Sequence, residues 1–348
     1  MTRRWSILCA GDNFISPELM AGSLRATVGE ACDIRLYRTN WPIDPSRFSD
    51  DIREWAGDQA DLAEAAVDAE IIVTHNAPIG RILLDRARLL KLVACCRGGP
   101  ANIDLGVATS HGVTVVNAPG RNAEATAEFA VGLLLAGVRR IADASAVMRS
   151  GGWDRSFYRY DLAGIELFEK TLGVVGLGRV GRRVATILSG FGGEVLAFDP
   201  YAPPEEFQAA RATSVELAEL LDRSDVVTIH ARLSTETRHL FNDAAFSQMK
   251  LGAYFVNTAR GDLVDYDALA NQLRSGHLSG AAFDVFPEEP LPTDHPLRQL
   301  PNVLMTPHVA GATKEAARRG ATEVAEDVAR YCRGEALLHV VRLAAPAL

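Results

Sequence analysis

The chain has 348 residues, of which 48% are hydrophobic and 23% are charged, the proportions of a soluble globular protein with a sizeable core. Its length predicts two domains, because one domain usually takes ~100–200 residues. The formal net charge of −8, together with the lack of any Lys and Arg cluster interleaved with aromatics, argues against a nucleic-acid partner.

The cysteines and the apolar segments indicate which metal sites, compartment and membrane contacts to expect. The five cysteines form no CxxC pair and have no zinc-like spacing from histidine, so we expect no metal site. They are typical of buried thiols in a reducing compartment, and we expect a cytoplasmic protein. Asp12 ends the first apolar stretch too early for a signal peptide. The longest apolar segment, residues 129–138, is too short to span a bilayer, so no membrane partner is expected.

Short apolar strands alternate with helices in the first third of the chain. The strands are predicted at residues 7–10, 34–37, 70–74, 91–96 and 113–116. Parallel strands need crossover connections, so this alternation predicts an α/β fold with a doubly wound open sheet. The loop Arg97-Gly98-Gly99 follows the fourth strand, at the edge where such sheets bind ligands.

Residues 117–121 break this pattern, and residues 124–148 predict one long helix rich in Ala and Leu. A second strand and helix series follows, with strands at 172–175, 194–198, 225–230, 253–257, 279–284 and 302–306. Ser214 and Asp265 are expected to cap the helices that follow them.

The last helix, about residues 314–332, could cross back onto the first domain. We therefore expect one domain of residues 1–117 and 318–348 and a second of residues 118–317. The two crossings between them would lie near residues 117–121 and 309–317.

The second domain is organised around residues 171–200. An apolar strand runs into Gly176, Gly178 and Gly181, with helical spacing afterwards. A second strand ends at Asp199, 23 positions after Gly176, where the dinucleotide-binding fingerprint places an acid. The glycines allow a tight turn, the approach of a pyrophosphate and close packing of the helix on the strand. Asp199 would accept hydrogen bonds from the ribose hydroxyls and repel a 2′-phosphate, which favours NAD over NADP.

Three further stretches, NTARGDLVD, FDVFPEEP and TPHVAGAT, each follow a predicted strand of the second domain. They offer Arg260, Glu289 and His308 at the carboxyl edge of the sheet. Hydride transfer between an alcohol and a carbonyl needs a proton donor near the oxygen and a cation for a substrate carboxylate. The three side chains are candidates for this chemistry.

With NAPGRNAEATAEF, GLGRVG, TETRHLF, NTARG, DVFPEEP and TPHVAG in this order, the sequence resembles the D-isomer-specific 2-hydroxyacid dehydrogenases. The resemblance implies a flavodoxin-like substrate domain, a Rossmann NAD-binding domain and a homodimer. It also implies that Arg260 binds the 2-oxo-carboxylate, that Glu289 pairs with His308, and that His308 donates and accepts the proton. Gly98 and Gly99 would offer N–H groups to the substrate, and Asp284 would lie near the nicotinamide. The cofactor-binding residues would be Gly176, Gly178, Arg179, Val180, Gly181, Asp199, His230, Thr258, Asp284 and Gly311.

Two residues depart from the family pattern. Arg97 stands where a small or apolar residue is usual, and Arg232 stands where proline is common, which leaves some room for NADP. If Arg97 points toward the substrate, that substrate should carry a second anion or several hydroxyls, as a sugar acid, a phosphorylated hydroxy acid or a dicarboxylate does. Alternatively, Arg97 pairs with an acid of its own domain.

Two other functions are alternatives to a 2-hydroxyacid dehydrogenase. A formate dehydrogenase is disfavoured, because that branch is known for Gln where this chain has Glu289. An NAD(H)-sensing interaction protein of the corepressor type stays open as the alternative. His75 and His111 stand in no motif with other candidate catalytic residues and are expected to be structural. His111 is expected to be a cation at a helix C-terminus.

Overall fold

The computed structural model describes residues 3–29, 31–44, 46–47, 49 and 51–342. The chain forms two compact units, Met1–Asn122 with Ala312–Leu348, and Ala123–Gly311. Residues 118–122 and 312–317, which the sequence analysis assigned to the second domain, lie in the first unit. One contact that holds them there is the hydrogen bond from Arg319 Nε to the carbonyl of Arg121, at 2.8 Å.

The first unit is a five-stranded parallel sheet in the order β2-β1-β3-β4-β5, flanked by helices. All five predicted strands are confirmed. The elements are β1 (Trp5–Gly11), α1 (Pro17–Val28), β2 (Cys32–Arg38), α2 (Gln59–Ala65), β3 (Ile71–Thr74), α3 (Arg81–Arg86), β4 (Leu92–Cys95), α4 (Leu105–Ser110), β5 (Thr114–Asn117) and α12 (Lys314–Arg333).

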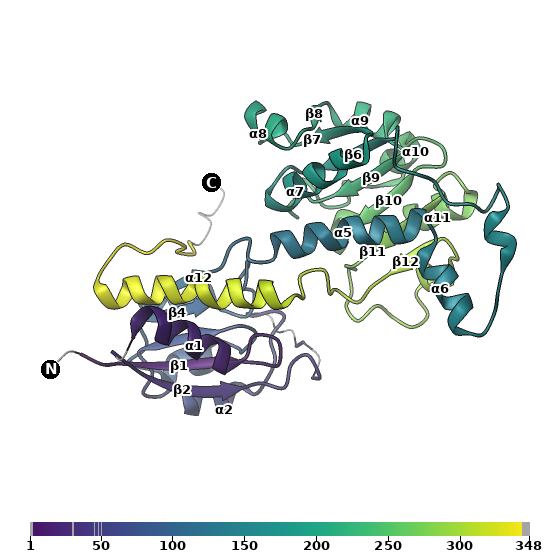
Figure 1. The fold of residues 1–348 in the computed structure, drawn as a ribbon. Coiled ribbons are helices and arrows are strands. Elements are labelled where there is room, and N and C mark those ends of the chain that lie inside the picture. The colour runs from purple at the N-terminus through teal and green to yellow at the C-terminus, as the bar shows by residue number, and fades with distance from the viewer. Residues whose placement is uncertain (1–2, 30, 45, 48, 50, 343–348) are drawn as a thin grey trace. The chain divides into compact units, whose positions relative to one another are not determined.

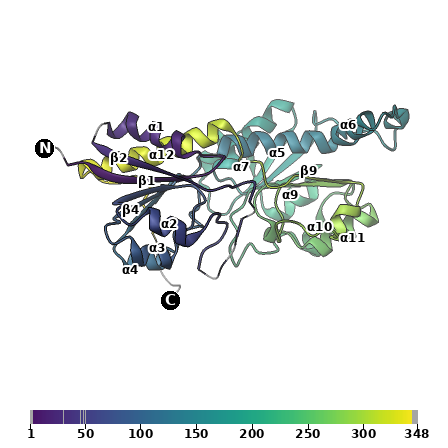
Figure 2. The same ribbon diagram turned by 90° about the horizontal axis from the view of Figure 1, so that it is seen from below.

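Successive residues of these strands point to opposite faces of the sheet, and each face is covered by helices. Leu8 and Ile72 pack with α2, α3 and α4, whereas Ile7 and Ile71 pack with α1 and α12. Figure 2 shows α1 and α12 on one side of these strands and α2 to α4 on the other. The last helix, α12, therefore belongs to the first unit and packs in its core.

The second unit is a seven-stranded parallel sheet in the order β12-β11-β10-β9-β6-β7-β8. Its elements are α5 (Ala123–Val138), α6 (Ile141–Arg149), η1 (Arg155–Tyr158), β6 (Thr171–Val175), α7 (Arg179–Leu188), η2 (Ser189–Phe191), β7 (Glu194–Phe198), α8 (Pro204–Ala209), β8 (Thr213–Ser214), α9 (Leu217–Arg223), β9 (Val226–Ile229), α10 (Asp243–Gln248), β10 (Tyr254–Asn257), η3 (Gly261–Leu263), α11 (Tyr266–Ser275), β11 (Gly280–Phe283), η4 (Pro296–Gln299) and β12 (Val303–Met305).

Two apolar cores hold this sheet between helices. One contains residues of α5, α7 and α8, and the other contains residues of α9, α10 and α11. Figure 1 labels these helices together with the strands of the sheet. The second core includes a cluster of aromatic rings, in which the ring centres of Phe241 and Phe255 lie 4.7 Å apart. The expectation of two doubly wound parallel sheets is confirmed.

The single helix predicted over residues 124–148 is wrong, because the chain forms α5 and α6 with a break between them. Arg140, at φ +53°, is in the left-handed region. The carbonyl of Val138 accepts a hydrogen bond from the N–H of Ile165 at 3.1 Å. Arg140 Nη1 also donates to the carbonyl of Leu162 at 3.2 Å. A later segment therefore ends α5, and the helical pattern of 124–148 carries no sign of it.

Of the two predicted helix caps, one is confirmed and one is wrong. Asp265 caps α11 by accepting from the N–H groups of Asp267 and Ala268, both at 3.1 Å. Ser214 instead belongs to β8, an edge strand that pairs with β7 and that was not predicted. The helix after it begins at Leu217 and has no side-chain cap.

Candidate active site

The turn after β6 has the shape that the glycine fingerprint predicts. Gly176 is at φ +90°, and a Cβ there would lie 2.6 Å from the backbone nitrogen of Ala231. A Cβ on Gly181 would lie 1.9 Å from the carbonyl oxygen of Gly176. Any side chain at either position would collide with backbone, so only glycine lets α7 pack this close to β6.

The start of α7 is suited to an anionic ligand. The helix begins at Arg179, and its N-cap residue, Gly178, provides no side-chain cap. The first-turn N–H groups of a helix have no partner within the helix and carry partial positive charge. A Cβ on Gly178 would meet nothing within 4 Å, so backbone is open to close approach there. These features fit the pyrophosphate of a dinucleotide.

Asp199 stands directly after β7 and is tied to this turn. Its Oδ2 accepts from the N–H of Leu177 at 2.7 Å, and its Oδ1 accepts from the N–H of Tyr201 at 2.9 Å. The carboxylate is therefore held beside the glycine turn, where the fingerprint places the ribose ligand.

His230 and Thr258 stand directly after β9 and β10 of the same sheet. The N–H of His230 donates to the carbonyl of Val175 at 2.7 Å, and its Nε2 lies 3.0 Å from Oγ1 of Thr228. Burial lowers the pKa of His230 to about 4, so the ring is neutral at physiological pH. Thr258 Oγ1 is buried and has no hydrogen-bond partner among the residues that the structure describes.

Glu289 and His308 form a direct hydrogen bond. Nδ1 of His308 lies 2.6 Å from Oε2 of Glu289, and Oε1 of Glu289 accepts from the N–H of Phe286 at 2.9 Å. The bond to Glu289 raises the pKa of His308 above its usual value, partly opposed by desolvation and by the charge of Arg260. Because Nδ1 faces the carboxylate, Nε2 is the ring nitrogen left for a substrate. His308 is also at φ +54°, a backbone conformation that residues other than glycine rarely adopt and that often occurs at active sites.

Asp284 shapes the loop that carries His308. Its Oδ1 accepts from Oγ1 of Thr306 at 2.6 Å and from the N–H of Val309 at 2.9 Å. Its Oδ2 accepts from the N–H of Ala310 at 2.8 Å. Asp284 is predicted to lie beside the nicotinamide, and no signal in the sequence indicates this second role. Gly311 ends the same loop and is the last residue of the second unit.

Arg260 follows β10 with its side chain exposed. Its Nη1 donates to the carbonyl of Ala259 at 2.7 Å. Asn257 Nδ2 donates to the carbonyl of Arg260 at 2.9 Å, and Asn257 Oδ1 accepts from the N–H of Ala259 at the same distance. Asn257 therefore fixes the turn that presents Arg260. Sequence reasoning missed this role, although Asn directly after an apolar strand is a turn signal.

In the first unit, Arg97 is engaged by protein acceptors. Its Nη1 donates to the carbonyl of Glu54 at 2.9 Å and to Oδ1 of Asn76 at 2.7 Å, and its Nη2 pairs with the Glu54 carboxylate. This is the second of the two orientations that the sequence left open. Beside it, Asn117 Nδ2 donates to the carbonyl of Gly98 at 2.7 Å and braces the Gly98-Gly99 loop.

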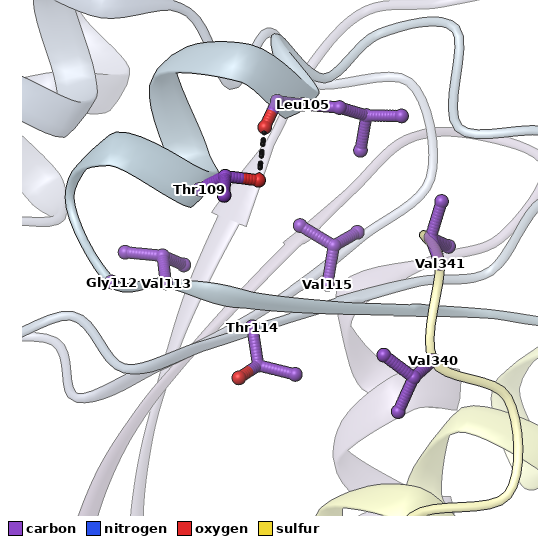
Figure 3. A pocket seen from close by; sticks show the side chains of 8 residues that line it. All are labelled: Leu105, Thr109, Gly112, Val113, Thr114, Val115, Val340 and Val341. Carbon is purple, nitrogen blue, oxygen red and sulfur yellow. Dashed lines mark hydrogen bonds between the residues drawn. The ribbon is translucent and has the colours of Figure 1, made fainter. Parts of the chain in front are cut away.

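Two surface cavities contain none of the predicted site residues. One of about 280 Å³ lies in the first unit between α4, β5 and the segment with Val340 and Val341 (Figure 3). The other, about 640 Å³, lies over α6 and η1. In the part of the chain that the structure describes, no three His, Cys, Asp or Glu side chains are grouped to hold a metal, and no helix is long and apolar enough to cross a membrane.

Comparisons with known proteins agree with this geometry. Residues 131–310 match the model of the NAD-binding domain of D-isomer specific 2-hydroxyacid dehydrogenases. The chain is 40% identical to D-3-phosphoglycerate dehydrogenase of Methanocaldococcus jannaschii over 81% of its own length and 53% of that protein, so it spans about half of that relative. It is 38% identical to glyoxylate reductase of Thermofilum pendens over 88% of this chain and 87% of that one. The solved NAD complex of formate dehydrogenase from Staphylococcus aureus has a TM-score of 0.76 and 28% identity, covering 97% of this chain and 98% of that one.

Proposed function

The chain belongs to the D-isomer specific 2-hydroxyacid dehydrogenases, and we propose that it interconverts a D-2-hydroxy acid and a 2-oxo acid. The glycine turn, the uncapped start of α7 and Asp199 fit NAD, which supplies or accepts the hydride when bound. The observation that carries the proposal is the hydrogen bond between His308 and Glu289. A protein that only senses NAD(H) has no need of an imidazole held ready for proton transfer.

In this proposal, each candidate site residue has one role in catalysis or substrate binding. Protonated His308 gives the proton on Nε2 to the carbonyl oxygen during reduction and takes it back during oxidation. The Glu289 carboxylate stabilises the imidazolium and fixes the ring. Arg260 binds the 2-oxo-carboxylate, and the N–H groups of Gly98 and Gly99 offer further hydrogen bonds to the substrate.

The curated relatives bring candidate substrates but leave the choice open. One is named for 3-phosphoglycerate and another for glyoxylate. The test is a panel of 2-oxo acids, including glyoxylate, hydroxypyruvate, its 3-phosphate and oxaloacetate, followed by NADH absorbance. Turnover of at least one of them supports the dehydrogenase. NADH binding without turnover of any panel member would favour the sensing alternative.

We also propose that the enzyme is a homodimer that pairs through α6 and η1. No residue of α6 is buried, and this segment exposes Trp153 at 75%, Tyr158 at 93% and Tyr160 at 99%. Aromatic side chains are enriched in interfaces, and such a patch favours a partner. Asp154 and Arg155 give the segment both signs of charge, so two copies of it can pair without a net like-charge repulsion. Light scattering should give twice the chain mass, and Trp153→Asp should lower it. A monomeric wild type would contradict the proposal.

The proposed location is the cytoplasm. No disulfide joins the five cysteines, all of which the structure describes, and four of them are buried. Cysteines in this number without a disulfide are typical of a reducing compartment.

A further inference from the structure

A buried network joins three loops at the carboxyl ends of β1, β3 and β5. Asp12 is fully buried, and its Oδ1 accepts from the N–H of Phe14 at 2.8 Å and of Ile15 at 3.0 Å. Its Oδ2 lies 2.6 Å from Nδ1 of His75. Nη2 of Arg121 lies 3.3 Å from Nε2 of the same ring.

These contacts fix the state of His75. A guanidinium only donates, so Nε2 of His75 must be the acceptor, and Nδ1–H must donate to Asp12. Burial lowers the pKa of His75, which agrees with a neutral ring. Both ring nitrogens are thus occupied within the network. His75 is a support that connects Arg121 to Asp12, and it is not a free acid or base.

Arg121 differs from the other cations at this edge of the sheet. It is only 8% exposed, yet its Nε and Nη1 have no hydrogen-bond acceptor among the described residues. Arg97 is paired with Glu54, and Arg38 is paired with Glu18. A buried N–H group without an acceptor is unfavourable, which makes Nε and Nη1 of Arg121 candidate donors to a bound ligand.

The surroundings hold Arg121 in place. A Cβ on Gly320 of α12 would lie 2.7 Å from Cδ of Arg121, so the glycine makes room for the side chain. The guanidinium also lies 5.7 Å from the ring centre of Phe14. A side chain positioned by contacts with a glycine of α12, an aromatic ring and a histidine is pre-organised for binding.

We propose that Arg121 determines substrate specificity by binding an anionic oxygen group, a carboxylate or a phosphate, at the end of the substrate away from the 2-oxo-carboxylate. This inference rests on the proposed function. Arg121 lies at the carboxyl edge of the sheet, as does the Gly98-Gly99 loop, and Asn117, four residues earlier in the chain, braces Gly98. Glu54 and Asn76 accept hydrogen bonds from Arg97. We therefore assign the contact with a second anionic group of the substrate to Arg121 and not to Arg97.

The test compares three substrates. Glyoxylate has no second anion, oxaloacetate adds a carboxylate, and 3-phosphohydroxypyruvate adds a phosphate. We expect the wild type to have a higher kcat/KM for at least one of the two substrates with a second anionic group than for glyoxylate. Arg121→Gln should lower kcat/KM for that substrate by about 10- to 100-fold, mainly through KM, and change glyoxylate turnover less than threefold. Arg121→Lys keeps the charge and should lose less.

Arg38→Gln is the matched control, because Arg38 also contacts Asp12, through the carbonyl oxygen, but pairs with an exposed acid. It should leave the ratio between substrates unchanged. Equal losses on all three substrates in Arg121→Gln, or a wild type that prefers glyoxylate, would overturn the inference. If Arg121→Gln fails to fold, the order of kcat/KM among the three substrates for the wild type and for Arg121→Lys still tests the inference. A wild type that turns over none of the panel would instead count against the proposed function.

Discussion

Nδ1 of His308 lies 2.6 Å from Oε2 of Glu289, and this contact raises the pKa of the imidazole. The protonated ring needed for carbonyl reduction therefore persists to higher pH than in an isolated histidine. Glu289→Gln should lower the pKa of His308 and move the high-pH fall of reductive kcat/KM to lower pH. For oxidation, which needs the neutral ring, activity should appear at lower pH. Full pH–rate profiles in both directions measure the shift, and coincident profiles would count against the pairing.

His308→Ala tests the proton transfer itself. We expect kcat to fall by ~10²–10⁴, because general acid–base catalysis is typically worth that much. NADH binding, followed by fluorescence titration, should be kept, because the glycine turn and Asp199 remain in place. A fully active variant would remove His308 from the mechanism.

Asp199 should decide between NAD and NADP. Asp199→Ala removes the carboxylate, and with it the ribose hydrogen bonds and the repulsion of a 2′-phosphate. It also removes the bonds to the N–H groups of Leu177 and Tyr201. Asp199→Asn is the matched variant, since it keeps the shape and loses the charge. Both should lower the ratio of kcat/KM for NAD over NADP. An unchanged ratio in both variants would withdraw the role of Asp199.

Much of the second unit could be predicted because its signals are local. The glycine turn is one example, since Gly181 contacts the carbonyl of Gly176 five residues earlier and the strand, turn and helix are continuous in the chain. The approach of Gly176 to the backbone of Ala231, after the neighbouring strand β9, is the one distant contact of this turn. The spacing to Asp199 follows from the length of one strand, one helix and the next strand. His308 and Glu289 could be paired only through the family resemblance, because 19 residues and an irregular loop separate them.

Contacts between distant segments could not be predicted. The break between α5 and α6 depends on Ile165, which no helical pattern in 124–148 reveals. The orientation of Arg97 depends on Glu54, 43 residues earlier, and both orientations are equally compatible with the sequence. His75 was expected to be structural, and its burial between Asp12 and Arg121 agrees with that expectation. His111 is confirmed at the C-terminus of α4, where Nδ1 lies 2.9 Å from the carbonyl of Val107.

His230 should make the apo-protein sensitive to acid. Its folded pKa of about 4 lies below the ~6.5 of an unfolded histidine, so the unfolded chain binds the extra proton between these values. The stability that His230 contributes is present above pH ~6.5 and is lost as the pH falls toward 4. The loss amounts to at most about 3 kcal/mol for this residue. Urea unfolding at pH 7 and pH 5 should show a smaller difference for His230→Asn than for wild type. Equal differences would refute the assignment.

Arg97 provides the complement to the Arg121 experiment. Its guanidinium is held by Glu54 and by Asn76, and the next residue, Gly98, begins the loop proposed to bind substrate. Arg97→Ala should release that loop and lower kcat/KM by a similar factor for glyoxylate and for larger 2-oxo acids. A factor of about 10 is expected, because one or two hydrogen bonds to a charged group are lost. Glu54→Gln should reproduce part of the effect without touching the loop itself. If instead Arg97→Ala raises KM strongly for a dianionic substrate and little for glyoxylate, Arg97 leaves Glu54 during binding and contacts the substrate directly.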